Sequence, residues 1–364
     1  MLQASTKRNI RRLLPFGLIW LLMGWVFLFV ESAASNSLNN LPVAAIQIDM
    51  EIFLFASIAI FCVGILMGYV EQNHWSKLFI HKNFVVRIFY KLLIYCTFIS
   101  LIILVLFPIA ASLELDVSPF DRQVWMRYAV YFGSFTHLST LLQLTVSLLL
   151  SLFYLEISEF IGHGVLMNFF TGKYHMPVEE ERIFMFLDMK ASTTIAEKLG
   201  HVEYFKLLRA YYHCFTDAII EYEGEIYQYV GDEIILSWNF EKDGRDRRCI
   251  DCFFAMRKKL WEKEAWFKEQ FGLAPSFKAG IHFGKTTVGE IGSIKKDIMF
   301  TGDVLNATAR IQGLCNDYEV DLIVSGDLIK ALDLGQPYAS RFLGEGALKG
   351  KRERKDIFTV TQRA

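Results

Sequence analysis

Three segments in the second half of this 364-residue chain place acidic or polar side chains where an apolar run ends. In the first, the apolar run Ile183–Leu187 predicts a buried strand, and Asp188 follows it directly. Ser192 and Thr193 then begin a predicted helix. Hydroxyl and free backbone N–H groups at a helix start bind phosphate, and a neighbouring carboxylate can hold a metal ion that also contacts the phosphates. The segment therefore predicts a combined metal and phosphate site.

The second segment, GEIYQYVGDEIILSW, predicts a β-hairpin with a carboxylate at its tip. Alternating apolar residues flank Gly231 and Asp232, a dipeptide typical of hairpin turns. Two Asp residues on adjacent strand ends could share two Mg²⁺ ions, as phosphoryl-transfer sites require. A Gly-Asp turn by itself is usually only a turn, so Asp232 is a candidate metal ligand only in combination with Asp188.

The third segment, AGIHFGKTTVGEIGSIKKDIMFTGDVLNATARIQ, ends in a predicted helix after Gly302 and Asp303. Asn306 and Arg310 are four residues apart and therefore share one face of this helix. Arg is suited to stabilise charge on a phosphoryl oxygen, and Asn can orient a ribose. A solvated or salt-bridged helix face is the alternative interpretation of this pair taken alone.

Together, the motifs DMKAST, QYVGD, GIHFGKTTVGEIG and GDVLNATAR resemble the class III nucleotide cyclases, the adenylate and guanylate cyclases. That family shows a strand ending in Asp, a K-x-x-G-D hairpin and G-D-x-V-N-x-x-x-R on a helix. The resemblance covers about residues 181–360. It implies an α/β ferredoxin-like catalytic domain over 181–364 that works as a homodimer with shared active sites. The implied reaction converts a nucleoside triphosphate to its 3′,5′-cyclic monophosphate and pyrophosphate, in signal transduction.

The resemblance also implies a role for each residue that matches a motif. Asp188 and Asp232 match the pair that binds two Mg²⁺ or Mn²⁺ ions per site, and Met189 would add its backbone carbonyl. Ser192 and Thr193 match the turn that receives the terminal phosphates.

Two further groups come from the same resemblance. Asn306 and Arg310 match the catalytic pair that stabilises the transition state from the other subunit. The stretch LKGKRERKDIF makes Lys349 a candidate phosphate ligand, and Lys285 is a second candidate basic contact.

The positions that select the base depart from the family pattern. Adenylate cyclases usually carry Lys and Asp or Thr where this chain has Gln228 and Met299, and guanylate cyclases usually carry an acidic residue and Cys there. The Gln228 amide can flip and so match more than one base, while Met299 offers no hydrogen bond. ATP is the favoured substrate, and a guanylate cyclase or an antiphage pyrimidine cyclase is the alternative. Ala191 also replaces the usual Gly of the phosphate turn.

The first part of the chain has the composition of a membrane domain, predicted over 1–156. A bilayer core requires about 20 apolar helical residues. Four segments approximate this length without any Asp, Glu, Lys or Arg: Leu13–Val30, Ile52–Val70, Leu92–Leu113 and Tyr128–Leu155. A signal peptide is the alternative for the first segment, but its apolar run is longer than a usual signal core.

The distribution of basic residues predicts the orientation. Lys and Arg cluster before the first segment and after the second, whereas the loop from Glu31 to Glu51 contains neither. The positive-inside rule therefore predicts a multi-pass protein of the cell (inner) membrane with both termini in the cytosol. The partners expected are the nucleoside triphosphate, a second copy of the chain and the lipid bilayer. The net charge of −1 gives no argument for nucleic-acid binding.

A connector is predicted over 157–180, where the apolar sequence suits either a rigid tether or an element that transmits changes from the spans. His137 and Gln143 lie in the fourth segment, where helix packing is the favoured interpretation and a ligand site is the alternative. The competing functions for the whole chain are a catalytically silent membrane receptor or scaffold and a channel with a regulatory domain. The charge-free spans argue against an ion path.

Overall fold

The computed structural model describes residues 4–37, 50–75, 82–162, 168, 171–240, 247–347 and 354–362. The chain forms two compact units, one made of Thr6–His163 and the other centred on Gly164–Ala364. The predicted connector, 157–180, extends across this division. Each unit is described separately below.

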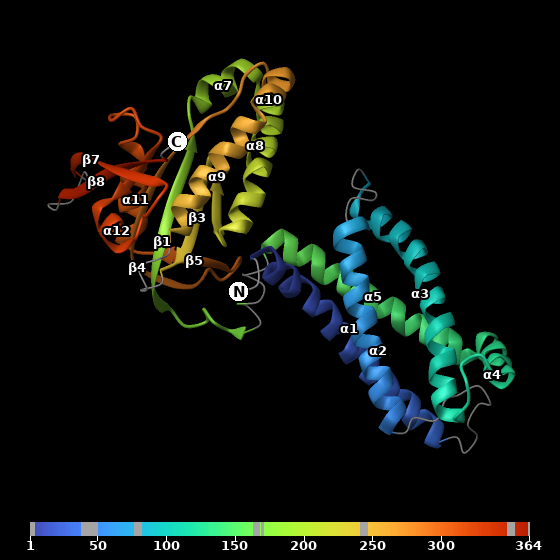
Figure 1. Ribbon diagram of the computed structural model, residues 1–364. Helices are drawn as coiled ribbons and strands as arrows, with labels where there is room; N and C mark the ends of the chain where they lie inside the picture. The colour runs from blue at the N-terminus through green and yellow to red at the C-terminus, as the bar shows by residue number, and fades with distance from the viewer. Residues whose placement is uncertain are drawn as a thin grey trace. The chain divides into compact units, whose positions relative to one another are not determined.

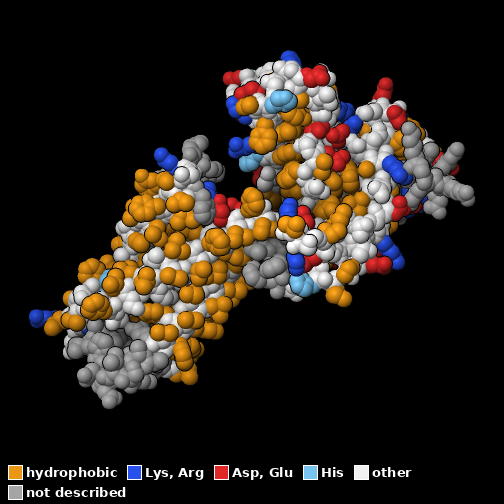
Figure 2. Space-filling model, turned by 180° about the vertical axis from the view of Figure 1, so that it is seen from behind, with side chains coloured by type: hydrophobic (Ala, Val, Ile, Leu, Met, Phe, Trp, Pro, Cys, Tyr) orange, Lys and Arg blue, Asp and Glu red, His pale blue; other side chains and the backbone are white. Residues whose placement is uncertain are grey.

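In its described residues, the first unit consists of helices and the short segments that connect them. Its elements are α1 (Ala4–Ser37), α2 (Met50–Val70), the short π-helix η1 (Glu71–Trp75), α3 (Phe84–Leu115), α4 (Arg122–Phe132) and α5 (Phe135–Ile161). Four stretches are long and apolar enough to cross a membrane: Arg12–Val30, Met50–Trp75, Val85–Leu115 and Phe135–Ile161. Hydrophobic side chains dominate the visible surface of this unit, while acidic and basic side chains are more frequent on the other unit (Figure 2).

The fourth apolar segment differs from the predicted Tyr128–Leu155. Tyr128 belongs to the separate helix α4, which ends at Phe132, and the candidate spanning helix α5 begins at Phe135. Ser134 caps α5, because its Oγ accepts a hydrogen bond from the backbone N–H of His137 at 3.2 Å. Apolar composition alone did not reveal this boundary, since it depends on a side-chain-to-backbone bond that competes with a continuous helix.

Charged residues are buried inside the helical unit near the ends of its spans. Glu71 is buried between α3 side chains, where it accepts hydrogen bonds from Lys91 and Tyr95. A buried charge is tolerated when it is paired in this way. Two further ion pairs involve α5, which is joined to α1 by Arg12–Glu159 and to α3 by Arg87–Glu156.

The two polar residues predicted within the fourth span are placed by the structure in α5. His137 is buried and packs edge to face against Tyr131, with ring centroids 5.1 Å apart. The Nδ1 atom of His137 and the Nε2 atom of Gln143 have no hydrogen-bond partner among the described residues. The ring contact agrees with the packing interpretation of His137.

The second unit is an α/β domain built on one mixed sheet (Figure 1). Its strands are β1 (Val178–Met189), β2 (Glu225–Val230), β3 (Glu233–Asn239), β4 (Phe277–Ile291), β5 (Asp297–Thr301), β6 (Leu322–Ser325), β7 (Tyr338–Ala347) and β8 (Arg354–Gln362). Their order is β2-β3-β1-β4-β6-β8-β7, with β5 paired to β4. The β4–β6 pair is parallel, and the other pairs are antiparallel.

Helices cover both faces of this sheet. They are α7 (Ser192–Leu199), α8 (His201–Glu221), α9 (Arg248–Glu262), α10 (Glu264–Phe271), α11 (Asp303–Gly313) and α12 (Gly326–Ala331). Central strand β1 is apolar on both sides: Ile183, Met185 and Leu187 join the core under α8 and α9. Phe184 and Phe186 join a second core with Val304 of α11. The predicted strand therefore reads as a continuous apolar run, because neither of its faces meets water.

Helix α11 packs unusually close to β4. A Cβ atom added to Gly280 would lie 2.4 Å from the backbone nitrogen of Gln312, so only glycine permits this approach. Thr308, Ile311 and Gln312 are buried on the sheet side of α11, while Asn306 is exposed. One face of α11 therefore packs on the sheet, and the face that carries Asn306 is accessible to other molecules.

Candidate active site

The end of β1 and the β2–β3 hairpin bring Asp188 and Asp232 together. In the antiparallel pairing of β1 and β3, Asp188 lies opposite Glu233, the residue after Asp232. Burial and the neighbouring Asp232 raise the pKa of the Asp188 carboxyl, and Lys278 opposes this rise. Burial, Asp188 and Asp232 also raise the pKa of Glu233 to about 7. Three carboxylates thus crowd one edge of the sheet.

Two side chains that the sequence did not single out hold one oxygen of Asp188. Lys278, opposite Asp188 in β4, lies 3.4 Å from its Oδ2 atom. Gln312 of α11 donates to the same atom at 3.2 Å. Both contacts join residues about a hundred positions apart, so only the sheet register and the packing of α11 reveal them.

This arrangement fits a divalent cation. Although Glu233 lies near the two aspartates, the described residues contain no group of three or more His, Cys, Asp or Glu side chains that could hold a metal ion together. A metal held by Asp188 and Asp232 would therefore take further oxygen ligands from the backbone, from water or from phosphates, as Mg²⁺ commonly does. The side chain of Met189 is buried, so this residue could contribute only its carbonyl. A cation would also offset the mutual repulsion of the carboxylates.

The hairpin tip is held from α8 by a tyrosine that the sequence analysis missed. The Tyr212 hydroxyl donates to the carbonyl of Gly231 at 3.0 Å and lies 3.3 Å from the carbonyl of Glu233. These two residues flank Asp232 in the chain. Tyr212 therefore fixes the turn that presents the second carboxylate.

The predicted phosphate turn lies directly after β1. Ser192 is partly exposed and Thr193 is exposed at the first positions of α7. The preceding Ala191 has φ 53° and ψ 30°, the left-handed conformation that favours glycine. Ala191 stands where the family usually has Gly, so the structure keeps the turn geometry at some cost in backbone strain, about 1 kcal/mol.

The predicted catalytic pair lies on the part of α11 that does not pack on the sheet. Asn306 is exposed and Arg310 is partly exposed on α11, away from the buried face that carries Gln312 to Asp188. Lys285 is seven residues from Lys278 along β4 and therefore about 23 Å away along an extended strand. Lys349 lies outside the described residues.

The two predicted base-recognition residues lie on strands that contact one another. Gln228 is exposed on β2, and Met299 is 45% exposed on β5. Their neighbours in the chain are joined directly, because the Tyr227 hydroxyl oxygen accepts a hydrogen bond from the Phe300 backbone N–H at 3.3 Å. The structure therefore brings together two strands that are distant in the sequence.

The comparisons with known proteins agree with this fold. Residues 175–361 match the family described as the adenylate and guanylate cyclase catalytic domain. The chain is 31% identical over 210 residues to adenylate cyclase 2 of Rhizobium meliloti (strain 1021), a match that covers 58% of each protein. It is 26% identical over 182 residues to the adenylate cyclase of Anabaena cylindrica, covering 48% of this chain and 36% of that protein.

A solved structure shares the fold. The structure of a bacterial light-regulated adenylyl cyclase superposes with a TM-score of 0.52 at 22% identity, covering 63% of this chain and 66% of the other. With the family match spanning about half of its residues, the chain belongs to the adenylate and guanylate cyclase catalytic domain family. Its catalytic unit is thus a class III cyclase domain, and the resemblance of the motifs is confirmed.

The hydrogen bonds of Tyr212 to the hairpin tip predict that removal of its hydroxyl weakens metal binding. In Tyr212→Phe, the Asp232 turn loses a hydrogen bond worth about 1 kcal/mol, so the Mn²⁺ concentration that half-saturates thermal stabilisation should rise about fivefold. Tyr338→Phe is the matched control, since it removes a hydroxyl that donates to Asp251 at 2.6 Å. The control should lower the melting temperature without changing the Mn²⁺ requirement. Equal Mn²⁺ curves for both variants would contradict the assigned role of Tyr212.

Proposed function

We propose that this protein is a membrane-anchored nucleotide cyclase that converts ATP to 3′,5′-cyclic AMP and pyrophosphate in signal transduction. The observation that carries the proposal is the adjacency of Asp188 and Asp232 in a domain of the cyclase family. Asn306 and Arg310 are also present on an accessible face of α11. A silent receptor of this family would be expected to have lost metal-binding or transition-state residues.

The reaction forms one bond and breaks one bond at the α-phosphorus. The ribose 3′-hydroxyl gives up its proton to water and its oxygen attacks this atom in line. The bond between the α-phosphorus and the oxygen that bridges it to the β-phosphorus breaks, and pyrophosphate leaves. Two Mg²⁺ or Mn²⁺ ions, when bound, neutralise charge and favour the 3′-alkoxide. Asp188 and Asp232 would hold these ions, with the Met189 carbonyl as a further oxygen. Positioning and charge stabilisation then dominate catalysis, because little covalent work is asked of the protein.

The remaining site residues bind and orient the substrate in this proposal. Ser192, Thr193 and the free backbone N–H groups of α7 bind the terminal phosphates. Arg310 donates to the oxygens of the reacting phosphoryl group, and Asn306 orients the ribose. Lys349 and Lys285 are proposed as further phosphate contacts.

We also propose that two copies of the chain share each active site. The distribution of site residues over two faces of α11 supports a site shared between two copies. Gln312 uses one face to contact Asp188 of its own chain, whereas Asn306 and Arg310 occupy the other face. A second copy could therefore present its Asn306 and Arg310 to the Asp188–Asp232 pair of the first, while its own aspartates receive the same pair in return.

The preference for ATP rests on Gln228 and on the known relatives. An amide can accept from the adenine N6 amino group and donate to N1, and the exposed Gln228 side chain is available for such contacts. The two curated relatives described above are named adenylate cyclases. Since a flipped amide also matches guanine, guanylate cyclase is the second candidate, followed by a pyrimidine cyclase.

The function is tested with the full chain in membranes, supplied with Mn²⁺ and with ATP, GTP, CTP or UTP in separate reactions. We expect cyclic AMP as the main product, and Asp188→Asn should reduce its formation to background because the metal pair loses a charged ligand. Lys355→Met, which breaks a surface pair with Asp327, is the control and should retain activity. Absence of product from all four nucleotides would favour the silent receptor or scaffold.

The shared site is tested by mixing inactive subunits. Asp232→Ala and Arg310→Ala should each abolish activity alone, because each removes one half of every site. Co-expression of the two variants should restore up to about a quarter of wild-type activity, since half of the dimers combine one of each and contain one intact site. Failure of the mixture to recover any activity would refute the division of the site between two chains.

Membrane anchoring with both termini in the cytosol is the final part of the proposal. Four helices have the required length and composition, and the basic clusters favour this orientation. A fluorescent protein fused after Ala364 should fold and fluoresce, whereas alkaline phosphatase fused there should be inactive. Alkaline phosphatase inserted within 38–49 should be active. The opposite pattern would reverse the assigned topology.

A further inference from the structure

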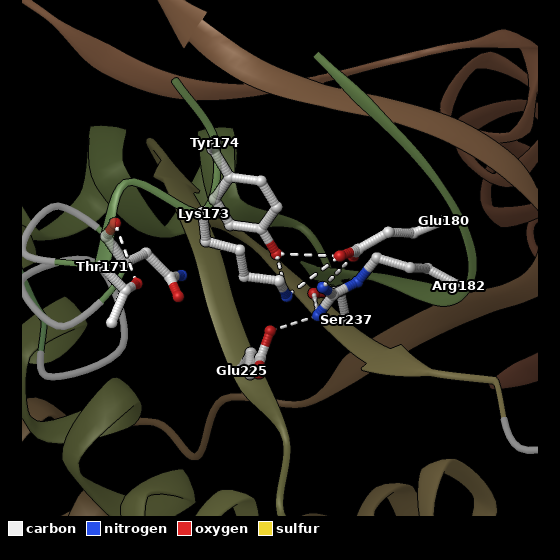
Figure 3. Close-up of polar contacts among 8 residues, drawn as sticks. Thr171, Lys173, Tyr174, Glu180, Arg182, Glu225 and Ser237 are labelled. Carbon is white, nitrogen blue, oxygen red and sulfur yellow. Dashed lines mark hydrogen bonds and ion pairs between the residues drawn. The ribbon is translucent and has the colours of Figure 1, made fainter. Parts of the chain in front are cut away.

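A buried arginine lies on β1, outside the groups that the proposed reaction uses. Arg182 is 1% exposed, on the same face of the strand as Phe184. Figure 3 shows its guanidinium group between acidic and hydroxyl side chains from several elements. It donates to Glu180 at 3.0 Å and to the Ser237 hydroxyl of β3 at 3.1 Å, and it also binds Glu225 of β2. A buried cation requires such partners.

Arg182 also contacts the strand that carries one of the base-recognition residues. Its guanidinium carbon lies 4.8 Å from the centre of the Phe300 ring in β5. The planar guanidinium group can donate in its plane and stack on an aromatic face at the same time. One side chain of β1 therefore connects β2, β3 and β5.

The contact between β2 and β5 lies next to both base-recognition residues. The pairing of β2 with β3 shifts register between Ile226 and Gln228, which leaves Tyr227 as the extra residue of a bulge. The Tyr227 ring packs edge to face on Phe300 at 4.8 Å, in addition to its hydrogen bond with the Phe300 N–H. A bulge redirects the side chains beside it, so the position of Gln228 depends on this contact. Met299 is the residue before Phe300.

The same arginine is linked to the last part of the connector through Glu180. The carboxylate of Glu180 binds Arg182 with one oxygen, while the other accepts from Tyr174 at 3.1 Å and pairs with Lys173 at 3.0 Å. Tyr174 is buried in the core that contains Phe300. The connector residues and the base-recognition strands therefore share one network (Figure 3).

We propose that Arg182 is a positioning residue for base recognition, and that Lys173 and Tyr174 of the connector influence it through Glu180. By binding Glu225 and stacking on Phe300, Arg182 sets the spacing of the two strands that present Gln228 and Met299. The inference rests on the proposed function, because it assumes that these two residues face the base. It assigns control of nucleotide affinity and selectivity to a network that does not touch the nucleotide.

The test uses the full chain in detergent with Mn²⁺ and measures binding of the fluorescent methylanthraniloyl derivatives of ATP and GTP. Glu225→Gln is the first variant, since the Glu225 side chain is 61% exposed and its replacement leaves the core intact. Tyr174→Phe removes only the hydroxyl of the connector tyrosine. Each variant should weaken binding of the preferred derivative about fivefold and reduce the discrimination between the two.

Two controls separate positioning from a general structural effect. Lys355→Met breaks a surface ion pair elsewhere in the domain and should leave both affinities unchanged. The Mn²⁺ concentration that half-saturates thermal stabilisation should stay within about twofold of wild type in every variant, because none of the contacts described above joins this network to Asp188 or Asp232. Affinity and selectivity equal to those of Lys355→Met would overturn the proposal, as would a parallel rise in the Mn²⁺ requirement.

The outcome is distinguishable from failure of the proposed function. A wild-type chain that binds the derivatives but forms no cyclic nucleotide from any substrate would refute the function, and the binding data would still decide the role of Arg182. A wild-type chain that binds neither derivative would overturn both proposals.

Discussion

The close approach of the Asp188 and Asp232 carboxylates is the constraint around which the catalytic unit is arranged. Like charges in a partly buried site repel, and the raised pKa of Asp188 reflects this repulsion together with burial. The fold maintains the pair with contacts from three directions: Lys278 from the sheet, Gln312 from α11 and Tyr212 from α8. A divalent cation bound between the two carboxylates would relieve this repulsion, so the proposed metal site agrees with the geometry of the pair.

Helix α11 connects this constraint to the proposed dimer. It packs closely on Gly280 of β4, and its Gln312 side chain donates to Asp188 of its own chain. Asn306 and Arg310 are then held on the opposite side by the helical repeat. In the proposed mechanism, the groups that bind metal and the groups that stabilise the transition state therefore belong to different copies. Activity would depend on association, which an anchored membrane domain favours by raising the local concentration of catalytic domains.

Each of the two units contains ion pairs that could regulate the proposed cyclase activity. Within the helical unit, α5 is joined by ion pairs to α1 and to α3. Within the catalytic unit, Lys173 and Tyr174 are joined to Arg182 through Glu180, and Arg182 contacts the strands of the proposed base site. The polar network contains two cations, Lys173 and Arg182, and two carboxylates, Glu180 and Glu225, so its formal charges balance. Arg182 is the buried member of this network, and it depends on the carboxylates for compensation.

The amino-acid sequence by itself determined the features that depend on local composition and spacing. These are the four apolar segments, the strand ending in Asp188, the Gly-Asp hairpin with Asp232, and the helix with Asn306 and Arg310. Short-range periodicity and turn chemistry suffice to predict such elements, because they act over a few residues. The start of the fourth span was wrong because the Ser134 cap interrupts a run that is apolar in composition.

Only the tertiary structure decided which distant residues support the site. Lys278 reaches Asp188 through the register of β1 with β4, and Gln312 reaches it through the packing of α11. Tyr212 and Arg182 lie on elements that are apolar or amphipathic by pattern, and nothing in their local sequence indicates that Tyr212 contacts the hairpin turn or that Arg182 is buried among carboxylates. Their partners are fixed by strand order and helix packing, which join positions far apart in the chain. The sequence therefore predicted the proposed reacting groups, and the fold decided which residues hold them in place.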